Sequence, residues 1–518
     1  MAIETVLRDD VRFPVLNRGK NPRFPPTPAE GASRIALCDS TADVAEALER
    51  FVHAGLRPTV RSGGHCYENF TYTNPQGAIL DLSMMADTTP EANGPKYRVA
   101  AGTQLGQAYT ELYKRAQVTI PGGSCVTVGA GGHISGGGYG LLSRLHGVTP
   151  DWVTAVDIVT VDKAGKAVAR RVDRNRDADL FRACRGAGGG SFGIITNFYF
   201  DKLPMAPVEV MKGSLNFGWD GMTEERFARI LYLYSNYWAT RGKDPDTWGL
   251  FTVFGLSHRS SGHLGMSVQF CNQDGTCNDL KPLEEFFALF EECKPITSGA
   301  VKAPQAMEDH APQSAGGGDD VCLLAKHTVT KRNWLEANVG GGGGGSNAVE
   351  QRRKHKSTYM KGAFTKYEAA CIYKYLNVTI PGVDLSRETV LADSFGGAVN
   401  RKELIEETSV AQRASTLKLQ FIASWVGADQ DAPNLKWLKD FYTELYSGPD
   451  ADARHRGTPY HGDGYEGCYI NYPDVDMLAY EFWPQLYYGD KGMYPFLQSV
   501  KRKYDPNNIF HHAMSVRA

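Results

Sequence analysis

Three dense clusters of glycine in the first two hundred residues constrain this chain more than any other feature. They lie at 61–65, 129–140 and 186–193. Glycine has no side chain, so backbone N–H groups in such loops can approach a phosphate or pyrophosphate closely. One cluster alone would more often mark a set of tight turns. Three clusters in one region instead predict a site for a large dinucleotide such as FAD.

The two commonest nucleotide signatures are missing from the sequence. No G-x-G-x-x-G stands between an early strand and a helix, and no G-x-x-x-x-G-K-[ST] occurs. An ordinary NAD site and a mononucleotide P-loop are therefore not expected. Because no group of His, Cys, Asp and Glu has metal-ligand spacing, we expect no metal either.

Helix and strand patterns alternate through the glycine-rich region. Ser40 and Asp43 form a capping box ahead of an apolar helical face, which Gly55 closes. A second helix is predicted over 105–116. Runs rich in β-branched and aromatic residues predict strands at 59–60, 153–161 and 192–200. This part of the chain is therefore α+β or α/β.

Beyond about residue 207 strand patterns dominate, with candidates at 252–254, 264–270 and 417–425. In the last of these, apolar residues would share one face, namely Leu417, Leu419, Phe421, Ala423 and Trp425. The other face would carry Lys418, Gln420, Ile422 and Ser424. Such alternation predicts a sheet with one face packed and the other open to solvent or a cavity. The glycine runs at 316–318 and 340–345 predict loops or disordered segments, either a surface insertion or a flap over a pocket.

Length and charge limit the organisation and the partners. A chain of 518 residues is too long for one ordinary core, so two domains or one large split domain are expected. The net charge is −2 and the pI about 6.7, with no basic run to serve nucleic acid or a membrane surface. No apolar stretch reaches the roughly 20 residues that span a bilayer.

The first residues and the cysteines bear on the compartment. Residues 1–15 have no apolar core of a signal peptide, which favours an intracellular location, although a mature secreted form would read the same. Ten cysteines are ordinary usage rather than a disulfide scaffold. Cys271 and Cys277 could pair across a turn or stay reduced.

Two nucleophilic side chains stand at the edges of the first two glycine loops. His65 ends the first loop, and Cys125 lies just before the second. Singly, a histidine or a cysteine is usually structural, but these two could reach one bound cofactor. Imidazole nitrogen and thiolate are suited to attack an electron-poor flavin ring. Cys66, next to His65, is a rival nucleophile.

The chain resembles the berberine bridge enzyme-like oxidoreductases of the vanillyl-alcohol oxidase superfamily over most of its length. In the FAD-binding part the resemblance lies in V-R-S-G-G-H at 60–65, P-G-G-S-C at 121–125, the glycine segment 129–138 and F-R-A-C-R-G-A-G-G-G-S-F-G-I at 181–194. Elsewhere it lies in K-S-T-Y at 356–359, G-G-A-V-N-R at 396–401, Y-I-N-Y-P-D at 469–474 and Y-D-P-N-N-I-F at 504–510. Many members have a His-Arg pair where this chain reads Gln412-Arg413.

This resemblance implies an α+β fold with a split FAD-binding domain, residues 1–206 plus 456–518. A substrate domain, residues 207–455, would contain an antiparallel sheet backed by helices. The resemblance also implies that FAD is held by two covalent bonds, from His65 to the flavin 8α carbon and from Cys125 to carbon 6.

The resemblance implies roles for three further residues. Tyr472 matches the catalytic base of carbohydrate-oxidising members, Tyr67 a position that lines their substrate pocket, and Val128 an oxygen gate where a small residue goes with oxidase behaviour. A phenol with a pKa near 10 is a poor base at pH 7, so a nearby cation would have to favour its ionised form. Which residue supplies that cation is open.

The remaining candidates contact the cofactor or the substrate. Besides His65 and Cys125, the expected cofactor-binding residues are Arg61, Ser62, Gly63, Gly64, Gly129, Gly132, His133, Gly136, Gly137, Gly138, Gly140, Gly193, Ile195, Tyr469 and Asn471. For His133 a structural role beside the glycine loop is favoured over acid–base work. Asp393 and Gln420 could bind a polyhydroxylated substrate, although ordinary polar surface residues would read the same.

Together these features predict an oxidase that carries FAD on two covalent bonds. Tyr472 would take a proton from a sugar or oligosaccharide hydroxyl, a hydride would pass to the flavin, and O2 would be reduced to H2O2. Tailoring of a secondary metabolite, by oxidising an aromatic alcohol or closing a ring, is the alternative reaction. A flavin-carrying protein with little turnover is the alternative outside enzymes. The partners expected are a small-molecule substrate and O2, and the oligomeric state stays open.

Overall fold

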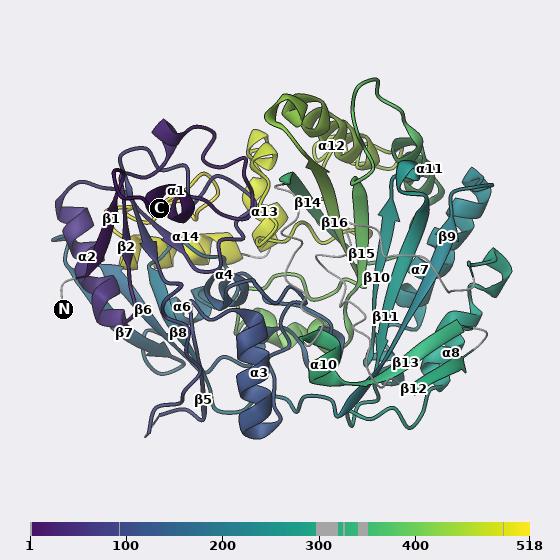
Figure 1. The fold of residues 1–518 in the computed structure, drawn as a ribbon, viewed down its shortest axis with the longest axis horizontal. Coiled ribbons are helices and arrows are strands. Elements are labelled where there is room, and N and C mark those ends of the chain that lie inside the picture. The colour runs from purple at the N-terminus through teal and green to yellow at the C-terminus, as the bar shows by residue number, and fades with distance from the viewer. Residues whose placement is uncertain (1–2, 93, 297–319, 325–326, 340–350, 491) are drawn as a thin grey trace.

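Three β-sheets carry the described part of the fold (Figure 1), two with four strands and one with eight. The two small sheets lie in the half built by the N-terminal residues, and the large sheet fills the other half. The computed structural model describes the residues 3–92, 94–296, 320–324, 327–339, 351–490 and 492–518.

The first sheet is mixed, and its strand β3 leads directly into the first glycine loop. Its strand order is β1-β2-β4-β3, with β1 antiparallel to β2 and the other neighbours parallel. Its strands are β1 (Glu4–Leu7), β2 (Arg34–Leu37), β3 (Pro58–Arg61) and β4 (Ala78–Asp81). Helix α2 (Thr41–His53) begins at the predicted capping box, where Ser40 Oγ accepts from Asp43 N at 3.2 Å.

The second sheet is antiparallel, in the order β5-β8-β6-β7. Its strands are β5 (Tyr97–Ala100), β6 (Ala155–Val161), β7 (Ala167–Asp173) and β8 (Ile194–Phe200). Helix α3 (Leu105–Ala116) has the predicted bounds and buries the predicted apolar face. Both predicted strands of this region are present as β6 and β8.

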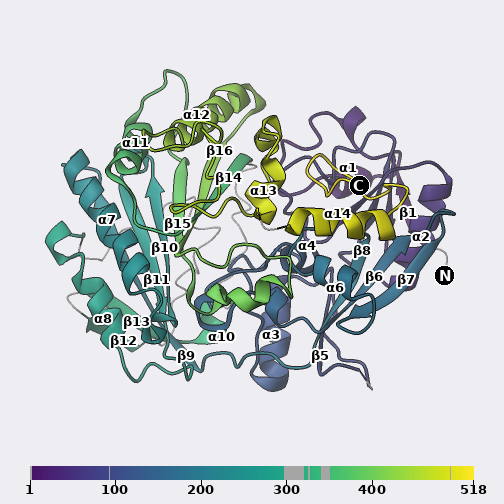
Figure 2. The same ribbon diagram turned by 180° about the vertical axis from the view of Figure 1, so that it is seen from behind.

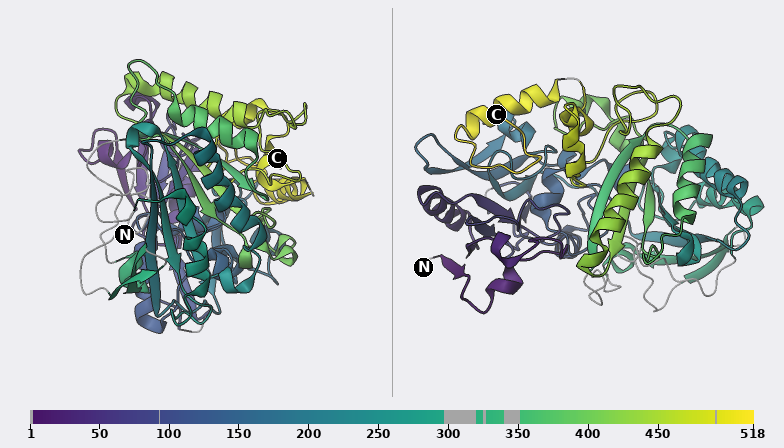
Figure 3. Two further views of the ribbon diagram at one scale, coloured as in Figure 1. Left: turned by 90° about the vertical axis from the view of Figure 1, so that its right-hand side faces the viewer. Right: turned by 90° about the horizontal axis from the view of Figure 1, so that it is seen from above.

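The large sheet is antiparallel throughout, in the order β12-β13-β9-β11-β10-β15-β16-β14. Its strands are β9 (Glu209–Gly218), β10 (Leu250–Ser257), β11 (His263–Phe270), β12 (Asp320–Leu324), β13 (His327–Asn333), β14 (Arg352–Met360), β15 (Thr389–Ser394) and β16 (Leu417–Trp425). Three long helices cover one face of the sheet (Figures 2 and 3): α7 (Glu224–Thr240), α11 (Lys366–Asn377) and α12 (Asp431–Leu445). All nine residues of β16 are buried, so the polar face predicted for this strand is shielded from solvent, and its Gln420 lines a cavity.

After the large sheet the chain returns to the N-terminal half, where α13 (Trp483–Tyr488) and α14 (Met493–Tyr504) lie in Figures 1 and 2. The buried Lys501 donates to Ser191 O at 2.8 Å, and Tyr504 donates to Asp179 at 2.8 Å. The two ends of the chain therefore share one half of the molecule. The domain boundaries near residues 206 and 455 stay a prediction.

The remaining helices are short: α1 (Phe13–Leu16), α4 (Ala130–Ser135), α5 (Ser143–His146), α6 (Ala178–Ala183), α8 (Lys281–Ala288) and α10 (Trp334–Asn338). Within the described ranges no helix combines the length and apolar character needed to cross a membrane. Cys271 and Cys277 are both buried free thiols. The glycine runs at 316–318 and 340–345 lie outside the described residues.

Candidate active site

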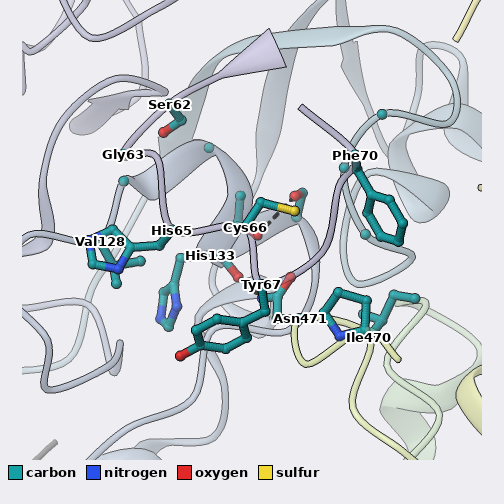
Figure 4. A pocket seen from close by; sticks show the side chains of 18 of the residues that line it. Ser62, Gly63, His65, Cys66, Tyr67, Phe70, Val128, His133, Ile470 and Asn471 are labelled. Carbon is teal, nitrogen blue, oxygen red and sulfur yellow. Dashed lines mark hydrogen bonds between the residues drawn. The ribbon is translucent and has the colours of Figure 1, made fainter. Parts of the chain in front are cut away.

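A cavity of about 330 Å³ lies where the glycine loops, the C-terminal segment and the large sheet meet. Figure 4 shows His65, Cys66 and Tyr67 in succession along one loop, with His133 from α4 and Asn471 from the C-terminal segment in the same pocket. Most of the predicted site residues line it: Arg61, Ser62, Gly63, Gly64, His65, Tyr67, Cys125, Val128, Gly129, Gly132, His133, Gly140, Gly193, Ile195, Asp393, Gln420, Tyr469, Asn471 and Tyr472. The structure thus brings together residues separated by more than four hundred positions.

The first two glycine loops touch backbone to backbone. A Cβ atom at Gly63 would lie 2.2 Å from Gly129 N, so no larger residue fits at this crossing. The contact brings both predicted nucleophiles to one threonine. His65 Nε2 lies 3.0 Å from Thr127 Oγ1, and Cys125 Sγ lies 3.6 Å from the same oxygen.

Cys66, the rival nucleophile, also lines the cavity. Burial raises the pKa of its thiol to about 11. A thiol must ionise to attack, so this environment disfavours Cys66 as a flavin ligand near neutral pH.

His133 links two parts of the cavity wall. Gly123 N donates to His133 Nε2 at 2.9 Å, and Asn471 Nδ2 donates to His133 O at 3.0 Å. Burial lowers the pKa of His133 to about 4, so the ring is neutral at pH 7 and accepts from the backbone. These contacts support the structural role that the sequence favoured.

Three predicted cofactor-binding glycines, Gly136, Gly137 and Gly138, are not among the described residues that line the cavity. A Cβ at Gly136 would lie 2.0 Å from the Asn471 amide, and one at Gly137 would lie 2.8 Å from the Tyr469 ring. Tyr469 and the Gly138 backbone are also hydrogen-bond partners at 3.1 Å. These glycines therefore leave the room in which the C-terminal segment packs, and that segment itself lines the cavity.

The cavity wall fits an extended flavin dinucleotide. A Cβ at Gly132 would meet no atom within 4 Å, so this position opens into the cavity and lets a ligand approach the backbone. The wall continues past the third glycine cluster to His512, whose ring stacks on Phe70 at a centroid distance of 4.2 Å. Arg61 supplies a cation and is held by the fully buried Asp81 at 2.7 Å.

At the end of the cavity nearest the large sheet, four polar side chains form a hydrogen-bonded cluster. Tyr139 donates to Asp393, and the Tyr139 and Tyr472 hydroxyls lie 3.2 Å apart. Lys418 of β16 donates to the Tyr139 oxygen at 2.7 Å. Its ammonium also lies 3.8 Å from the centre of the Tyr472 ring. We call these four residues the tyrosine–lysine cluster.

Burial shifts the titration of this cluster strongly. It lowers the pKa of Lys418 from 10.5 to about 7. Burial, with Asp393 next, raises the pKa of Tyr139 well above 10, and burial with Tyr67 and Asp393 does the same for Tyr472. Burial also raises the pKa of Asp393. The Lys418 ammonium therefore titrates near neutral pH, far below the pKa of either buried tyrosine.

The other substrate candidates lie on the same side of the sheet. The Tyr67 ring stacks on His355 of β14 at 3.6 Å and is tilted against the Tyr472 ring at 5.5 Å. Gln420, next to Lys418 on that face of β16, pairs with His355 Nδ1 at 3.0 Å. Tyr67 and Gln420 thus face one space with the tyrosine–lysine cluster.

Sequence reasoning missed Lys418, Tyr139 and His355 as site residues. The alternation of 417–425 placed Lys418 and Gln420 on one face, which was the available signal for the missing cation. Tyr139 lies inside the second glycine cluster. Such a cluster predicts backbone contacts with a cofactor and gives no sign of a role for the Tyr139 hydroxyl.

Two family models match this chain. One is described as "FAD binding domain" and covers residues 32–168, and the other as "Berberine and berberine like" and covers residues 468–517. The matched segments contain both predicted flavin ligands and Tyr472.

Characterised relatives match along almost the whole chain. An aclacinomycin-N/aclacinomycin-A oxidase from Streptomyces galilaeus is 32% identical, covering all of this chain and 90% of the relative. A hexose oxidase from Chondrus crispus is also 32% identical, covering 98% of this chain and 94% of the relative. Among solved structures, a glycopeptide hexose oxidase complexed with teicoplanin has a TM-score of 0.84 at 29% identity, covering all of this chain and 99% of that one.

Proposed function

This chain belongs to the berberine bridge enzyme-like family of FAD-linked oxidoreductases, and from that premise we propose that it oxidises a hydroxyl group of a sugar with O2 as electron acceptor. The observation that carries the proposal is the tyrosine–lysine cluster, three of whose residues, Tyr139, Asp393 and Tyr472, line the same cavity as the predicted flavin ligands. A base beside a polar pocket is what abstraction of a hydroxyl proton requires.

We infer that His65 and Cys125 hold the flavin by two covalent bonds, to 8α and to carbon 6. Their approach to one hydroxyl, that of Thr127, supports attachment to two positions of one ring system. Bound in this way, FAD would accept the hydride that leaves the substrate and then pass two electrons to O2, giving H2O2. The double attachment would also prevent loss of the cofactor during turnover.

Tyr472 is the proposed base, because its hydroxyl belongs to the cluster and its ring lines the cavity. A buried phenol alone would hold its proton far above pH 7. Lys418 changes this balance, since a cation beside the two tyrosines favours a phenolate. Once one proton has left the cluster, the proton that remains can lie on the Lys418 nitrogen or on a tyrosine oxygen, so the titration belongs to the group as a whole.

The proton would leave the substrate oxygen for Tyr472 while the adjacent C–H bond gives up its hydride. Tyr139 connects Tyr472 to Lys418 and to Asp393. Its single hydroxyl proton goes to Asp393, so Lys418 acts on Tyr472 through space, from 3.8 Å above the ring, rather than through a hydrogen bond from Tyr139. Because Asp393 accepts from Tyr139, it also fixes the direction in which that hydroxyl points.

The polar groups of the pocket support a polyhydroxylated substrate. Tyr67, backed by the buried His355, offers an aromatic surface of the kind that covers a sugar ring, and Gln420 offers an amide in the same cavity. Two of the relatives are a hexose oxidase and a glycopeptide hexose oxidase complexed with teicoplanin. The sugar could accordingly be free or carried by a larger molecule.

Tailoring of a secondary metabolite is the second candidate function. It is favoured by the relative that acts as an aclacinomycin oxidase, which is as similar to this chain as the hexose oxidase.

Release of H2O2 with a substrate panel tests the proposal and separates its two forms. The panel should contain free hexoses, oligosaccharides, glycosylated aromatic compounds and the matching aglycones. Turnover of the sugars or glycosides, with a product oxidised at a sugar carbon, is expected. Turnover of the aglycones alone would make the protein a tailoring enzyme that does not act on sugars. No H2O2 and no flavin bleaching with any of them would contradict an oxidase function.

A further inference from the structure

A second polar cluster lies behind the pocket, at the edge strand β14. Lys354 bonds Glu68 and lies 2.7 Å from Asp474, while Lys356 lies 2.6 Å from both Asp474 and Asp476. Four of these five side chains are only 2% to 4% exposed, and Asp476 is 33% exposed. None of the five is among the described residues that line the cavity. We call them the ion cluster.

The ion cluster needs an explanation other than stability. It holds three carboxylates against two ammonium groups in a nearly dry environment, and ions so buried seldom stabilise a fold more than apolar groups of the same shape. Burial raises the pKa of Glu68. For Asp474 the two lysines outweigh burial and lower the pKa to about 2.

The geometry around β14 supplies that explanation. Successive residues of a strand point to opposite faces, so the two lysines lie on one face and His355 on the other. Tyr67 stacks on His355 at 3.6 Å while the next residue along its loop, Glu68, bonds Lys354. The loop thus contacts both faces of the edge strand, through Tyr67 on one face and Glu68 on the other.

The C-terminal segment also contacts both faces of β14. Tyr472 faces the cavity, and two residues later Asp474 bonds both lysines. Val475 N also donates to Glu68 Oε1 at 3.4 Å, which joins the two loops directly. On the pocket face of β14, Tyr469 N donates to Ser357 Oγ at 2.9 Å.

We propose that the ion cluster is a positioning device for the reaction: by fixing the loops that carry Tyr67 and Tyr472 to the edge strand of the large sheet, it sets these two rings against the tyrosine–lysine cluster. The inference rests on the proposed function, in which Tyr472 acts as the base. The ion-cluster residues act only through other residues and do not touch the substrate. A misplacement of about 1 Å at a reacting group can slow a reaction by about a hundredfold, so loosening the loops should have a kinetic cost.

Three variants test this inference, with a matched control. Glu68→Gln removes one charge and keeps the shape, and Lys354→Met leaves three carboxylates with one lysine. The double variant removes the pair together. The control is Arg413→Met, because Arg413 forms an equally buried ion pair with Asp151 at 2.7 Å and, among the described residues, neither lines the cavity.

Two readouts are needed, one of which requires no substrate. Fluorine NMR of the holoenzyme, with 3-fluorotyrosine placed at position 472, reports the surroundings of that ring. Stopped-flow absorbance under anaerobic conditions gives the rate of flavin reduction at saturating substrate. Urea unfolding of each variant measures stability separately.

We expect Glu68→Gln to shift or broaden the fluorine signal and to slow flavin reduction by about ten- to a hundredfold. The double variant should recover stability relative to Lys354→Met without recovering the rate. Arg413→Met should lose stability but keep the wild-type signal and rate. An unchanged signal in Glu68→Gln and in the double variant, with rates within twofold of wild type, would overturn the inference. If no substrate reduces the wild-type flavin, the proposed function fails, while the fluorine comparison still decides whether the ion cluster positions Tyr472.

Discussion

Replacing Lys418 with methionine should slow the chemistry and, at the same time, stabilise the fold. The ammonium lies 2.7 Å from the Tyr139 oxygen and 3.8 Å from the centre of the Tyr472 ring, and the side chain is fully buried. At an effective dielectric constant of about 20, unit charges about 4 Å apart interact by about 4 kcal/mol. Losing that stabilisation of a phenolate corresponds to about a thousandfold in rate.

The pH dependence of the variant follows from the pKa values of the cluster. In the wild type the rate of flavin reduction should rise with pH around 7, where one proton leaves the Lys418–tyrosine group. Without Lys418, the proton must come from a tyrosine whose pKa burial raises well above 10. The rise should therefore move beyond the pH range in which the enzyme is measured.

Stability should change in the opposite direction. Lowering the pKa of Lys418 from 10.5 to about 7 corresponds to a cost of about 5 kcal/mol in folding at or below pH 7. Between pH 7 and 10.5 the unfolded chain binds this proton and the folded chain does not, so the cost shrinks as the pH rises. Loss of the hydrogen bond to Tyr139 offsets roughly 1–3 kcal/mol of the gain. Lys418→Met should thus be about 2–4 kcal/mol more stable than the wild type at pH 6, whereas at pH 10, where the cost has shrunk to about 1 kcal/mol, it should have no advantage.

Anaerobic stopped-flow absorbance and urea unfolding at both pH values measure these effects. Flavin reduction within tenfold of the wild-type rate, with the same dependence on pH, would show that Lys418 does not support the base. A loss of stability at pH 6 would show that the buried ammonium is satisfied by its neighbours, contrary to the reasoning above.

Three further predictions concern the flavin. Tryptic peptides containing His65 and Cys125 should be joined through one FAD in mass spectra, and free FAD released on acid precipitation would contradict this. His65→Ala and Cys125→Ala should each leave a single link, whereas Cys66→Ala should keep both, because its thiol is held un-ionised by burial. Val128→Leu should slow reoxidation of the reduced flavin by O2 and spare its reduction by substrate; an unchanged reoxidation rate would show that Val128 is not the oxygen gate.

Local signals in the sequence predicted local structure well. The capping box at Ser40 and Asp43 begins α2, and the helix predicted over 105–116 is present with those bounds. The alternating run 417–425 is a strand along its whole length. These features depend on neighbours a few residues apart, which the sequence places directly.

The glycine clusters indicated the cofactor class for a similar reason, since close backbone approach requires glycine wherever it occurs. They could not separate positions that face the cavity, such as Gly132, from those that admit the C-terminal segment, such as Gly136. That distinction depends on Asn471, more than three hundred residues away.

The tyrosine–lysine cluster and the ion cluster could not be predicted from the sequence, because each contains residues from three or four distant segments. Lys418 is a charged residue on one face of a predicted strand until the fold brings Tyr139 and Tyr472 to it. Likewise, Glu68 and Lys354 are unremarkable surface types in the sequence, and only the contact between a loop and the edge strand makes them partners.

The most direct test of the central claim is the rate of flavin reduction in Tyr472→Phe, measured anaerobically with a sugar that the wild type oxidises. The substitution removes one oxygen and keeps the ring, so flavin attachment and reoxidation by O2 should stay near normal. Reduction by substrate should slow by at least about a hundredfold, as expected for loss of a general base. Reduction at close to the wild-type rate would contradict the account and would mean that Tyr472 is not the base.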